Sequence, residues 1–379
     1  MFAIGCGITV ANLYYVQPLL SEMAQFWKTS EAQMGTIAAL TTGGYGCGLL
    51  LFVPLGDIIE RRRLILFFIT AITMLLVALA TSGNLTVLAI LSFALGAFTI
   101  VPQLIIPLAA SLASPTQRGS VIGIMQSGLL IGILVSRSIG GFAGDHWGWR
   151  SVYWLSAAIN VLLLITFVFR LPQKEPSSKI SYLELLRSTL SIVFTERIVR
   201  TSAFIGAMTF GSFCAFWTSL SFFASGAPYF YSPDKIGLFG LIGASGVLAA
   251  PVAGRLADKR GPMFGIGVSL VLVLLSYVIL AFFAGNLLGL IVGVIVLDMA
   301  AHSSQVSNMA RIYSLNAQMH NRVNTIYMFS YFMGGSLGAW AGTFGWTHWG
   351  WAGVCVAGAS FPLLGLLLFL FISARDRKL

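Results

Sequence analysis

Long apolar stretches alternate with short polar clusters along the whole chain. Each stretch is about 20 residues long, the length that an α-helix needs to cross the hydrocarbon core of a bilayer. The stretches are rich in Gly and Leu and lack the alternation over about 10 residues that barrel strands show. The pattern therefore predicts twelve transmembrane helices, at residues 2–20, 35–55, 64–82, 86–110, 120–142, 151–171, 201–223, 236–254, 263–283, 287–309, 323–344 and 352–373.

The chain also contains an internal repeat. The tetrapeptide His-Trp-Gly-Trp occurs at 146–149 and again 202 positions later, at 348–351. Small residues of the fifth span recur at the same offset, in the pairs Gly132/Gly334, Ser136/Gly338 and Gly140/Gly342. A repeat of this length built of apolar spans indicates two homologous membrane bundles. We predict an all-α polytopic membrane protein with six-helix bundles at 1–171 and 201–379, joined by a linker at 172–200.

Composition supports the membrane assignment and sets an orientation. Apolar residues make up 57% of the chain and charged residues 9%, against roughly 25% charged in soluble domains. If the N-terminus is cytoplasmic, 18 of the 22 Lys and Arg residues fall on the cytoplasmic side, as the positive-inside rule requires. The net charge of +10 is then a topology signal and indicates no nucleic-acid partner. We expect a monomer in the bacterial inner membrane, with both termini cytoplasmic.

The linker and the cysteines complete this picture. Residues 181–198 show amphipathic periodicity, which predicts a helix along the membrane surface; a plain tether is the alternative. The four cysteines fall inside apolar spans without metal-ligand spacing, so we expect neither a disulfide nor a metal site. No residue pattern calls for a cofactor.

Two basic loops carry a family resemblance. Residues 254–261, Gly-Arg-Leu-Ala-Asp258-Lys-Arg260-Gly, are similar to the loop signature of the major facilitator superfamily. Residues 53–63, Val-Pro-Leu-Gly-Asp57-Ile-Ile-Glu-Arg61-Arg62-Arg, keep the aspartate and the trailing arginines but depart at three other signature positions. With its two six-span halves, the chain resembles this superfamily over its whole length.

The resemblance implies a role for these loops. Each aspartate and the arginines near it would latch the halves together on the cytoplasmic side when the transporter faces outward. We assign this gating role to Asp57, Arg61, Arg62, Asp258 and Arg260. The alternative is that these charges only set the topology, which explains the arginines but not an acid placed among them.

Further motifs resemble the bacterial twelve-span drug:proton antiporters, above all Asn12-Leu-Tyr-Tyr-Val-Gln-Pro in the first span. This resemblance implies proton-driven export of a small molecule. One element departs from the pattern: those antiporters carry Gly-Pro-x-x-Gly-Gly in span 5, where this chain has Ser136-Arg-Ser-Ile-Gly-Gly141. The proline is absent, but small residues at four-residue spacing still provide a face for close helix packing.

Asp298 is the leading candidate for proton coupling. It lies about 11 residues into span 10, roughly 16 Å of helix rise from the outer surface, where an ionised carboxylate is expensive. His302 and Gln305 follow at i+4 and i+7 and share its helix face. A carboxylate with an imidazole partner is a plausible proton-binding site; the alternative is a buried structural pair.

Arg137 is the second intramembrane charge. It lies about five residues, roughly 8 Å, from the outer end of span 5. It could snorkel to the interface, or it could gate the pathway or hold an anionic group. The internal repeat matches Arg137 with Ala339 and Asp298 with Gly96. Each half therefore carries one deep charge that the other lacks, and a direct ion pair between the two is possible.

Uncharged amides and aromatic residues suit a moderately apolar ligand. They occur on the spans that face the cavity in the resembled fold, although any one of them could instead bond two helices together. We expect the substrate-binding residues to be Asn12, Tyr15, Gln17, Gln103, Gln126, Trp217, Gln305, Tyr327 and Tyr331.

The hypothesis that follows is a proton-coupled secondary transporter that moves a small molecule by alternating access and exports a drug or metabolite. The alternative within this class is a facilitator or importer of a small polar metabolite, such as a sugar, without obligatory proton coupling. A Walker-type ATP-binding loop is absent from the sequence. An enzyme is disfavoured because the histidines are scattered over different depths. A truncated product is a further alternative, because Met1 leads straight into the first span.

Overall fold

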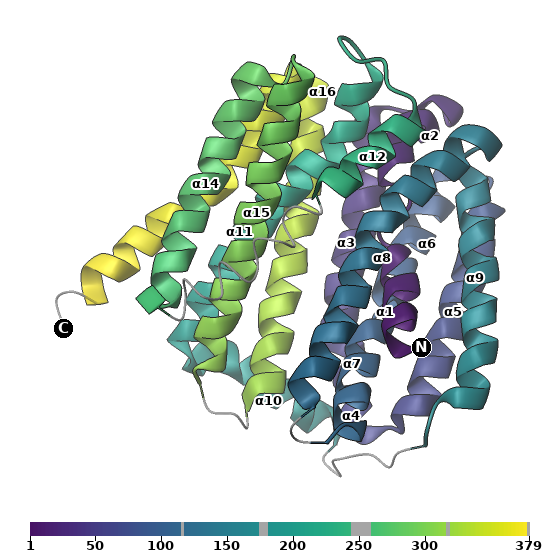
Figure 1. The fold of residues 1–379 in the computed structure, drawn as a ribbon, viewed down its shortest axis with the longest axis vertical. Helices are drawn as coiled ribbons and strands as arrows, with labels where there is room; N and C mark the ends of the chain where they lie inside the picture. Colours follow the sequence, from purple (N-terminus) through teal and green to yellow (C-terminus); the bar gives the residue numbers. More distant parts are fainter. Residues whose placement is uncertain (115–116, 174–180, 244–258, 316–318, 377–379) are drawn as a thin grey trace.

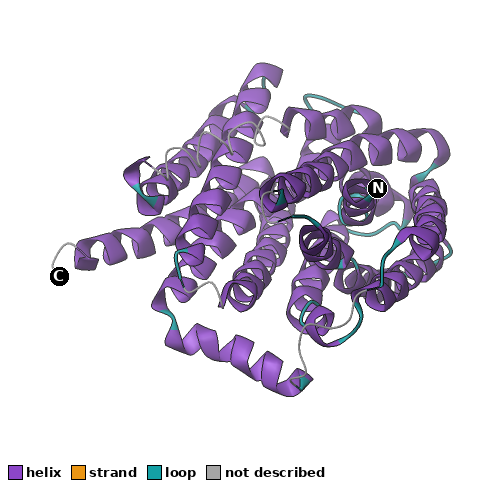
Figure 2. Ribbon diagram, turned by 60° about the horizontal axis from the view of Figure 1, so that its bottom comes forward, coloured by secondary structure: helices purple, strands orange, loops and turns teal. Residues whose placement is uncertain are grey.

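A computed structural model of the chain describes residues 1–114, 117–173, 181–243, 259–315 and 319–376 (Figure 1). Within these ranges the chain forms helices joined by short loops, and no strand occurs in them (Figure 2). Nine of the described helical stretches are long and apolar enough to cross a membrane. The all-helical prediction is therefore confirmed.

The first half of the chain supplies the helices drawn from purple to teal in Figure 1. They are α1 (Phe2–Ala11), the 3₁₀ helix η1 (Gln17–Leu19), α2 (Leu20–Phe26), α3 (Glu31–Phe52), α4 (Leu55–Ile58), α5 (Arg61–Ala80), α6 (Leu85–Phe98), α7 (Val101–Leu112), α8 (Arg118–Trp147) and α9 (Trp149–Arg170).

The second half lies beside the first and is drawn from teal-green to yellow. Its helices are α10 (Tyr182–Thr195), α11 (Arg197–Ser225), α12 (Pro233–Gly243), α14 (Pro262–Phe283), α15 (Leu287–Tyr313) and α16 (His320–Asp376). α16 contains both the eleventh and the twelfth predicted spans, and of the eighth span the described residues include only α12.

Two predicted spans are broken rather than continuous, and prolines explain both breaks. A proline has no N–H for the carbonyl four residues earlier, and its ring clashes with that carbonyl. Pro102 stands four residues after Phe98, where α6 ends. Pro18 of η1 stands four residues after Tyr14, and Tyr14 lies in the stretch of turns between α1 and η1. The first and fourth spans are therefore each built from consecutive short helices.

The two His-Trp-Gly-Trp copies form the same turn. Gly148 (φ +77°) separates α8 from α9, and Gly350 (φ +60°) marks the kink inside α16. Glycine adopts such positive φ values without the steric cost that other residues meet. The tryptophans before these glycines, Trp147 and Trp349, are 67% and 66% exposed, as expected for interfacial anchors. The tryptophans after them pack inward, with Trp149 only 3% exposed.

The ladder of small residues holds each half together. A side chain at Gly132 would overlap the backbone of Gly7, so α8 and α1 meet along their backbones. In the second half a side chain at Gly338 would overlap the carbonyl of Gly211, which joins α16 to α11 in the same way. Such close backbone approach is how helices associate where lipid removes the hydrophobic driving force. The small residues that recur 202 positions apart in the sequence therefore make the same kind of helix contact in both halves.

The predicted linker helix is present as α10. Ser181 and Glu184 form a reciprocal capping box at its start, which satisfies two backbone donors. Leu185 and Ile192 are buried, whereas Leu183 and Phe194 are 74% and 81% exposed. The face with Leu183 therefore points away from the bundle, and the other face packs against it.

We predict that Gly338→Ala destabilises the protein by about 1–3 kcal/mol, because a methyl group there forces α16 away from α11. The measurement is the apparent melting temperature of the purified protein in detergent. Gly285→Ala is the control, since nothing lies within 4 Å of a side chain at that position. Equal melting temperatures for the two variants would show that the close approach is dispensable.

Candidate functional site

A cavity of about 770 Å³ lies between the two halves. At one end of the bundle it is lined by Arg118 at the start of α8, Tyr313 at the end of α15 and His320 at the start of α16. We call this the basic end; α4 and α10 lie there, at the bottom of Figure 1. Arg137 and Asp298 line the cavity at its depth. Its volume is in the range of small-molecule sites.

The halves meet at the opposite end, where α2 and α12 lie (Figure 1). Three serines form a cluster there: the Ser21 N–H donates to Ser221 Oγ (3.2 Å), and the Ser21 and Ser225 hydroxyls are 2.9 Å apart. The Trp346 indole N–H donates to Glu31 across the same junction. Hydrogen bonds between α2 or α3 and α11 or α16 thus join the two halves at this end.

The centre of the site consists of two buried charges that share one tryptophan. The Trp217 Nε1–H donates to Asp298 Oδ1 at 3.0 Å. The guanidinium carbon of Arg137 lies 3.9 Å from the centroid of the Trp217 ring, a cation–π contact. Arg137 Nε also donates to Gln17 Oε1 at 2.8 Å. Arg137 and Asp298 are each 2% exposed, and among the described residues neither forms an ion pair.

Arg137 does not snorkel to the membrane surface. Side chains on a helix lean toward its N-terminus. α8 starts at the basic end, so Arg137 leans toward that end, whereas α15 finishes there, so Asp298 leans the opposite way. The two side chains therefore lean toward each other, which reduces the difference in depth that the sequence positions of Arg137 and Asp298 predict. Both side chains reach Trp217, which takes the place of a direct ion pair.

Three glycines on α12 make room for these charges. A side chain at Gly237 would meet the Arg137 carbonyl, and one at Gly240 would lie 3.0 Å from Arg137 Cβ. One at Gly243 would overlap Asp298 Oδ2. The glycines recur every three residues and so share one face of α12. This face packs directly against the centre, and a side chain at Gly243 would also lie 3.1 Å from the Trp217 ring.

His302 and Gln305 line the cavity with Asp298, as their helical spacing predicts. The expected imidazole partnership is not observed. His302 forms no hydrogen bond to any described residue; its ring lies edge-on to Phe213, with centroids 6.3 Å apart. The Asp298 carboxylate is instead bonded by Trp217, because the indole N–H of α11 reaches it from the neighbouring helix.

The predicted binding residues fall into three groups. Gln103, Gln126, Gln305 and Tyr331 line the cavity. Gln17 and Trp217 lie behind its wall and contact Arg137. Three others are packed inside the halves and do not line it: Asn12, which accepts a hydrogen bond from Ser156, together with Tyr15 and Tyr327. Their side chains are buried in the packing of their own half, and the sequence pattern does not show which way they face.

Several cavity residues were missed by sequence reasoning. Tyr14 rather than Tyr15 lines the cavity, because the turns after α1 rotate the chain. Phe210 and Phe213 also line it. They stand seven and four positions before Trp217 on the same helix face, and that spacing could have identified them.

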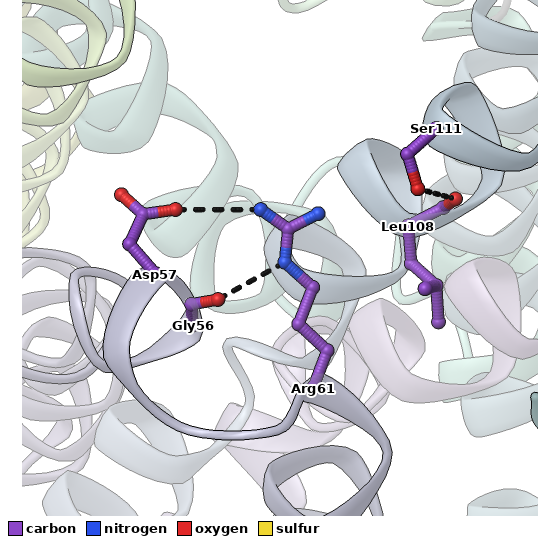
Figure 3. A network of polar contacts seen from close by, with 5 residues as sticks. All are labelled: Gly56, Asp57, Arg61, Leu108 and Ser111. Carbon is purple, nitrogen blue, oxygen red and sulfur yellow. Dashed lines mark hydrogen bonds and ion pairs between the residues drawn. The ribbon is translucent and has the colours of Figure 1, made fainter. Parts of the chain in front are cut away.

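The loop after α3 forms a local network (Figure 3). Arg61 Nη2 pairs with Asp57 Oδ1 at 3.3 Å, and Arg61 Nε donates to the Gly56 carbonyl at 3.1 Å. Arg62 donates to the Val168 carbonyl of α9 at 2.7 Å. All these contacts stay within the first half of the chain.

The second basic loop is described only in part. Arg260 lies with its guanidinium carbon 4.9 Å from the Phe264 ring centroid. Asp258, for which a gating role is predicted, lies outside the described residues. The predicted equivalence of the two loops is therefore untested.

A cavity between two repeated helical bundles, with charges at its depth and one end closed, is the architecture of a membrane transporter. The model of the Major Facilitator Superfamily matches residues 2–339, and the chain belongs to this family.

Relatives named as transporters match nearly the whole chain. The uncharacterized transporter YgaY of Escherichia coli O157:H7 is 39% identical over 369 residues, covering 97% of this chain and 94% of the relative. The probable transporter SCO4007 of Streptomyces coelicolor is 30% identical, with coverage of 96% and 85%. The fold is similar to the crystal structure of a bacterial homologue of the human lysosomal transporter Spinster, in an inward-facing and occupied conformation. That match has a TM-score of 0.78 at 12% identity and covers 98% of this chain and 95% of that chain.

We predict that Trp217→Phe lowers stability by about 1–2 kcal/mol, because a buried carboxylate loses its donor. The loss should be smaller in an Asp298→Leu background, where no acceptor remains. Apparent melting temperatures of the four proteins form a double-mutant cycle.

Trp351→Phe serves as the matched control, since its indole donates to the Leu280 carbonyl instead (2.9 Å). Its effect should be the same in both backgrounds. A Trp217→Phe effect that is also the same in both would contradict the proposed contact.

Proposed function

We propose that this transporter is a proton-coupled secondary transporter, with Asp298 as the proton-binding group and the 770 Å³ cavity as the substrate site. The position of Asp298 carries this proposal. It is the only acidic residue among the described residues that line the cavity, and it is 2% exposed. A carboxylate at membrane depth without an ion pair is a functional candidate, because its charge is costly there. Protonation removes that cost.

The movement that delivers the substrate is alternating access. The two bundles, 1–171 and 201–379, would rock about the central site with 172–200 as their tether. The distribution of basic residues favours a cytoplasmic basic end in the bacterial inner membrane, with both termini on that side. In this orientation the cavity faces the cytoplasm and the serine cluster closes the outside.

Asp57 and Arg61 are the proposed cytoplasmic latch. They border a smaller cavity of about 90 Å³ whose far wall includes Asn321 and Asn324 of α16. Closing this gap would bring the Asp57–Arg61 pair onto the start of α16. The positive end of that helix dipole would attract the Asp57 carboxylate.

The direction of coupled transport depends on how the proton and the substrate affect each other. If they exclude each other from the cavity, the inward proton gradient drives export, as the family resemblance implies. If they bind together, the same gradient drives uptake. Both directions require the same proton site.

Asp298→Asn should abolish transport against a gradient and leave exchange or downhill flux intact, because the amide cannot carry a proton across the membrane. Inverted membrane vesicles with a ΔpH-sensitive quenching dye, screened across antibiotics, dyes, sugars, amino acids and organic acids, provide the measurement. Asp145→Asn is the matched control, an exposed acid outside the described cavity lining. Uphill transport that survives in the Asp298 variant would assign proton coupling elsewhere, or to no residue.

A disulfide across the serine cluster should lock the transporter. In a background without the four native cysteines, Ser21→Cys with Ser225→Cys should cross-link on oxidation, because the native hydroxyls are 2.9 Å apart. Transport should then fall to background and recover with a thiol reductant. Each single cysteine variant controls for the substitution itself. Full transport by the cross-linked protein would mean that this end need not open.

A further inference from the structure

The cavity carries an excess of positive charge. Its charged lining residues are Arg118, Arg137 and Asp298, and His302 and His320 are neutral unless protonated. Asp298 is already engaged by Trp217 and covered by Gly243. A cationic ligand would therefore meet two arginines and an acid that is already hydrogen-bonded and covered.

The Arg137 guanidinium is held on several sides and unused on another. Gln17 takes the Nε–H, Trp217 covers one face, and Gly240 on α12 packs against the side-chain stem. Nη2 is itself buried and has no hydrogen-bond partner among the described residues. A buried guanidinium donor without an acceptor is costly. The fork geometry of this group fits the two oxygens of a carboxylate.

An aromatic wall lines the cavity near this guanidinium. Phe210 stacks on Tyr331 with ring centroids 4.1 Å apart and planes 15° apart, and Phe213 stacks beside Phe210 at 5.5 Å and 15°. The Tyr14 ring centroid lies 5.3 Å from the Arg137 guanidinium carbon. These aromatic side chains give the cavity an apolar lining, and aromatic side chains pack well against a planar apolar ligand.

We propose that the substrate is an organic carboxylate with a flat apolar body, whose acid group binds Arg137, and that it binds more tightly when Asp298 is uncharged. This inference rests on the proposed function only in taking the cavity as the substrate site. If these two charges served only to neutralise each other, a direct ion pair between Arg137 and Asp298 would be enough. Instead both contact Trp217, and one Arg137 donor has no partner among the described residues.

The second part of the proposal follows from Coulomb's law. A carboxylate on Arg137 lies close to Asp298, and two negative charges in a site of low dielectric repel each other. Neutral Asp298 removes the repulsion and leaves the Arg137 charge without a counter-charge. Proton and anion then favour each other's binding by the same factor. For this class of substrate, the coupling is co-transport, and the inward proton gradient drives uptake.

Binding to the purified protein in detergent tests this without any gradient. Isothermal titration calorimetry compares matched triplets of carboxylate, amide and amine: benzoate, 2-naphthoate and indole-3-acetate with their neutral and cationic counterparts. At least one carboxylate should bind, at least tenfold more tightly than its amide and its amine. Preference for an amide or an amine, or no binding by any carboxylate, would overturn the proposal.

Variants assign the binding to the residues. Arg137→Gln should reduce carboxylate affinity at least tenfold and Arg137→Lys by an intermediate factor, whereas Arg118→Gln at the cavity mouth should cost less than about threefold. Asp298→Asn, which imitates the neutral acid, should raise affinity roughly tenfold. Size-exclusion profiles confirm that each variant is folded. If Asp298→Asn binds the carboxylate no more tightly than the unmodified protein, the proposed coupling between proton and carboxylate is wrong. This test holds even if Arg137→Gln does not fold.

The two proposals fail in different ways. Carboxylate binding that depends on Arg137, without proton-driven flux in vesicles, retains the substrate class and removes proton coupling. Proton-driven flux of an amine or a neutral compound retains the proton site and removes the substrate class.

Discussion

The central constraint on this protein is the cost of two opposite charges buried between apolar helices. Neither Arg137 nor Asp298 can be left without a partner at that depth. Trp217 is a partner for both residues, because its indole N–H donates to the Asp298 carboxylate and its ring face attracts the Arg137 guanidinium. The contact crosses between the two halves of the chain, since Arg137 is on α8 and Trp217 on α11. The packing around this centre can be understood as a means of bringing those helices together.

Glycine makes that packing possible. The α12 glycines admit Arg137 and Asp298, and the ladders on α8 and α16 hold α1 and α11 at backbone contact. Because lipid tails are as apolar as most side chains of these helices, close approach of the backbones is a main source of helix association.

The sequence located both charges at the centre of the site but predicted a different partner for Asp298. Asp298 was identified by its depth in span 10 and Arg137 as the second intramembrane charge, and the repeat then showed that neither has a charged counterpart in the other half. The imidazole of His302 was expected to partner Asp298 from the next turn of the same helix, yet the indole of a different helix does so. Tyr15 was expected in the cavity where Tyr14 lies. The first error came from reading one helix without its neighbours, and the second from reading the first span as an unbroken helix.

Hydropathy, the 202-residue repeat and the basic loops determined the class of protein, because bilayer thickness and internal duplication leave their mark on spacing along the chain. They also marked the two unmatched charges. The tertiary structure alone decided that these charges share Trp217, that glycines of α12 enclose them, and that one end is closed by serines. Such contacts join residues far apart in the chain, on helices whose rotation and lean are fixed only by packing.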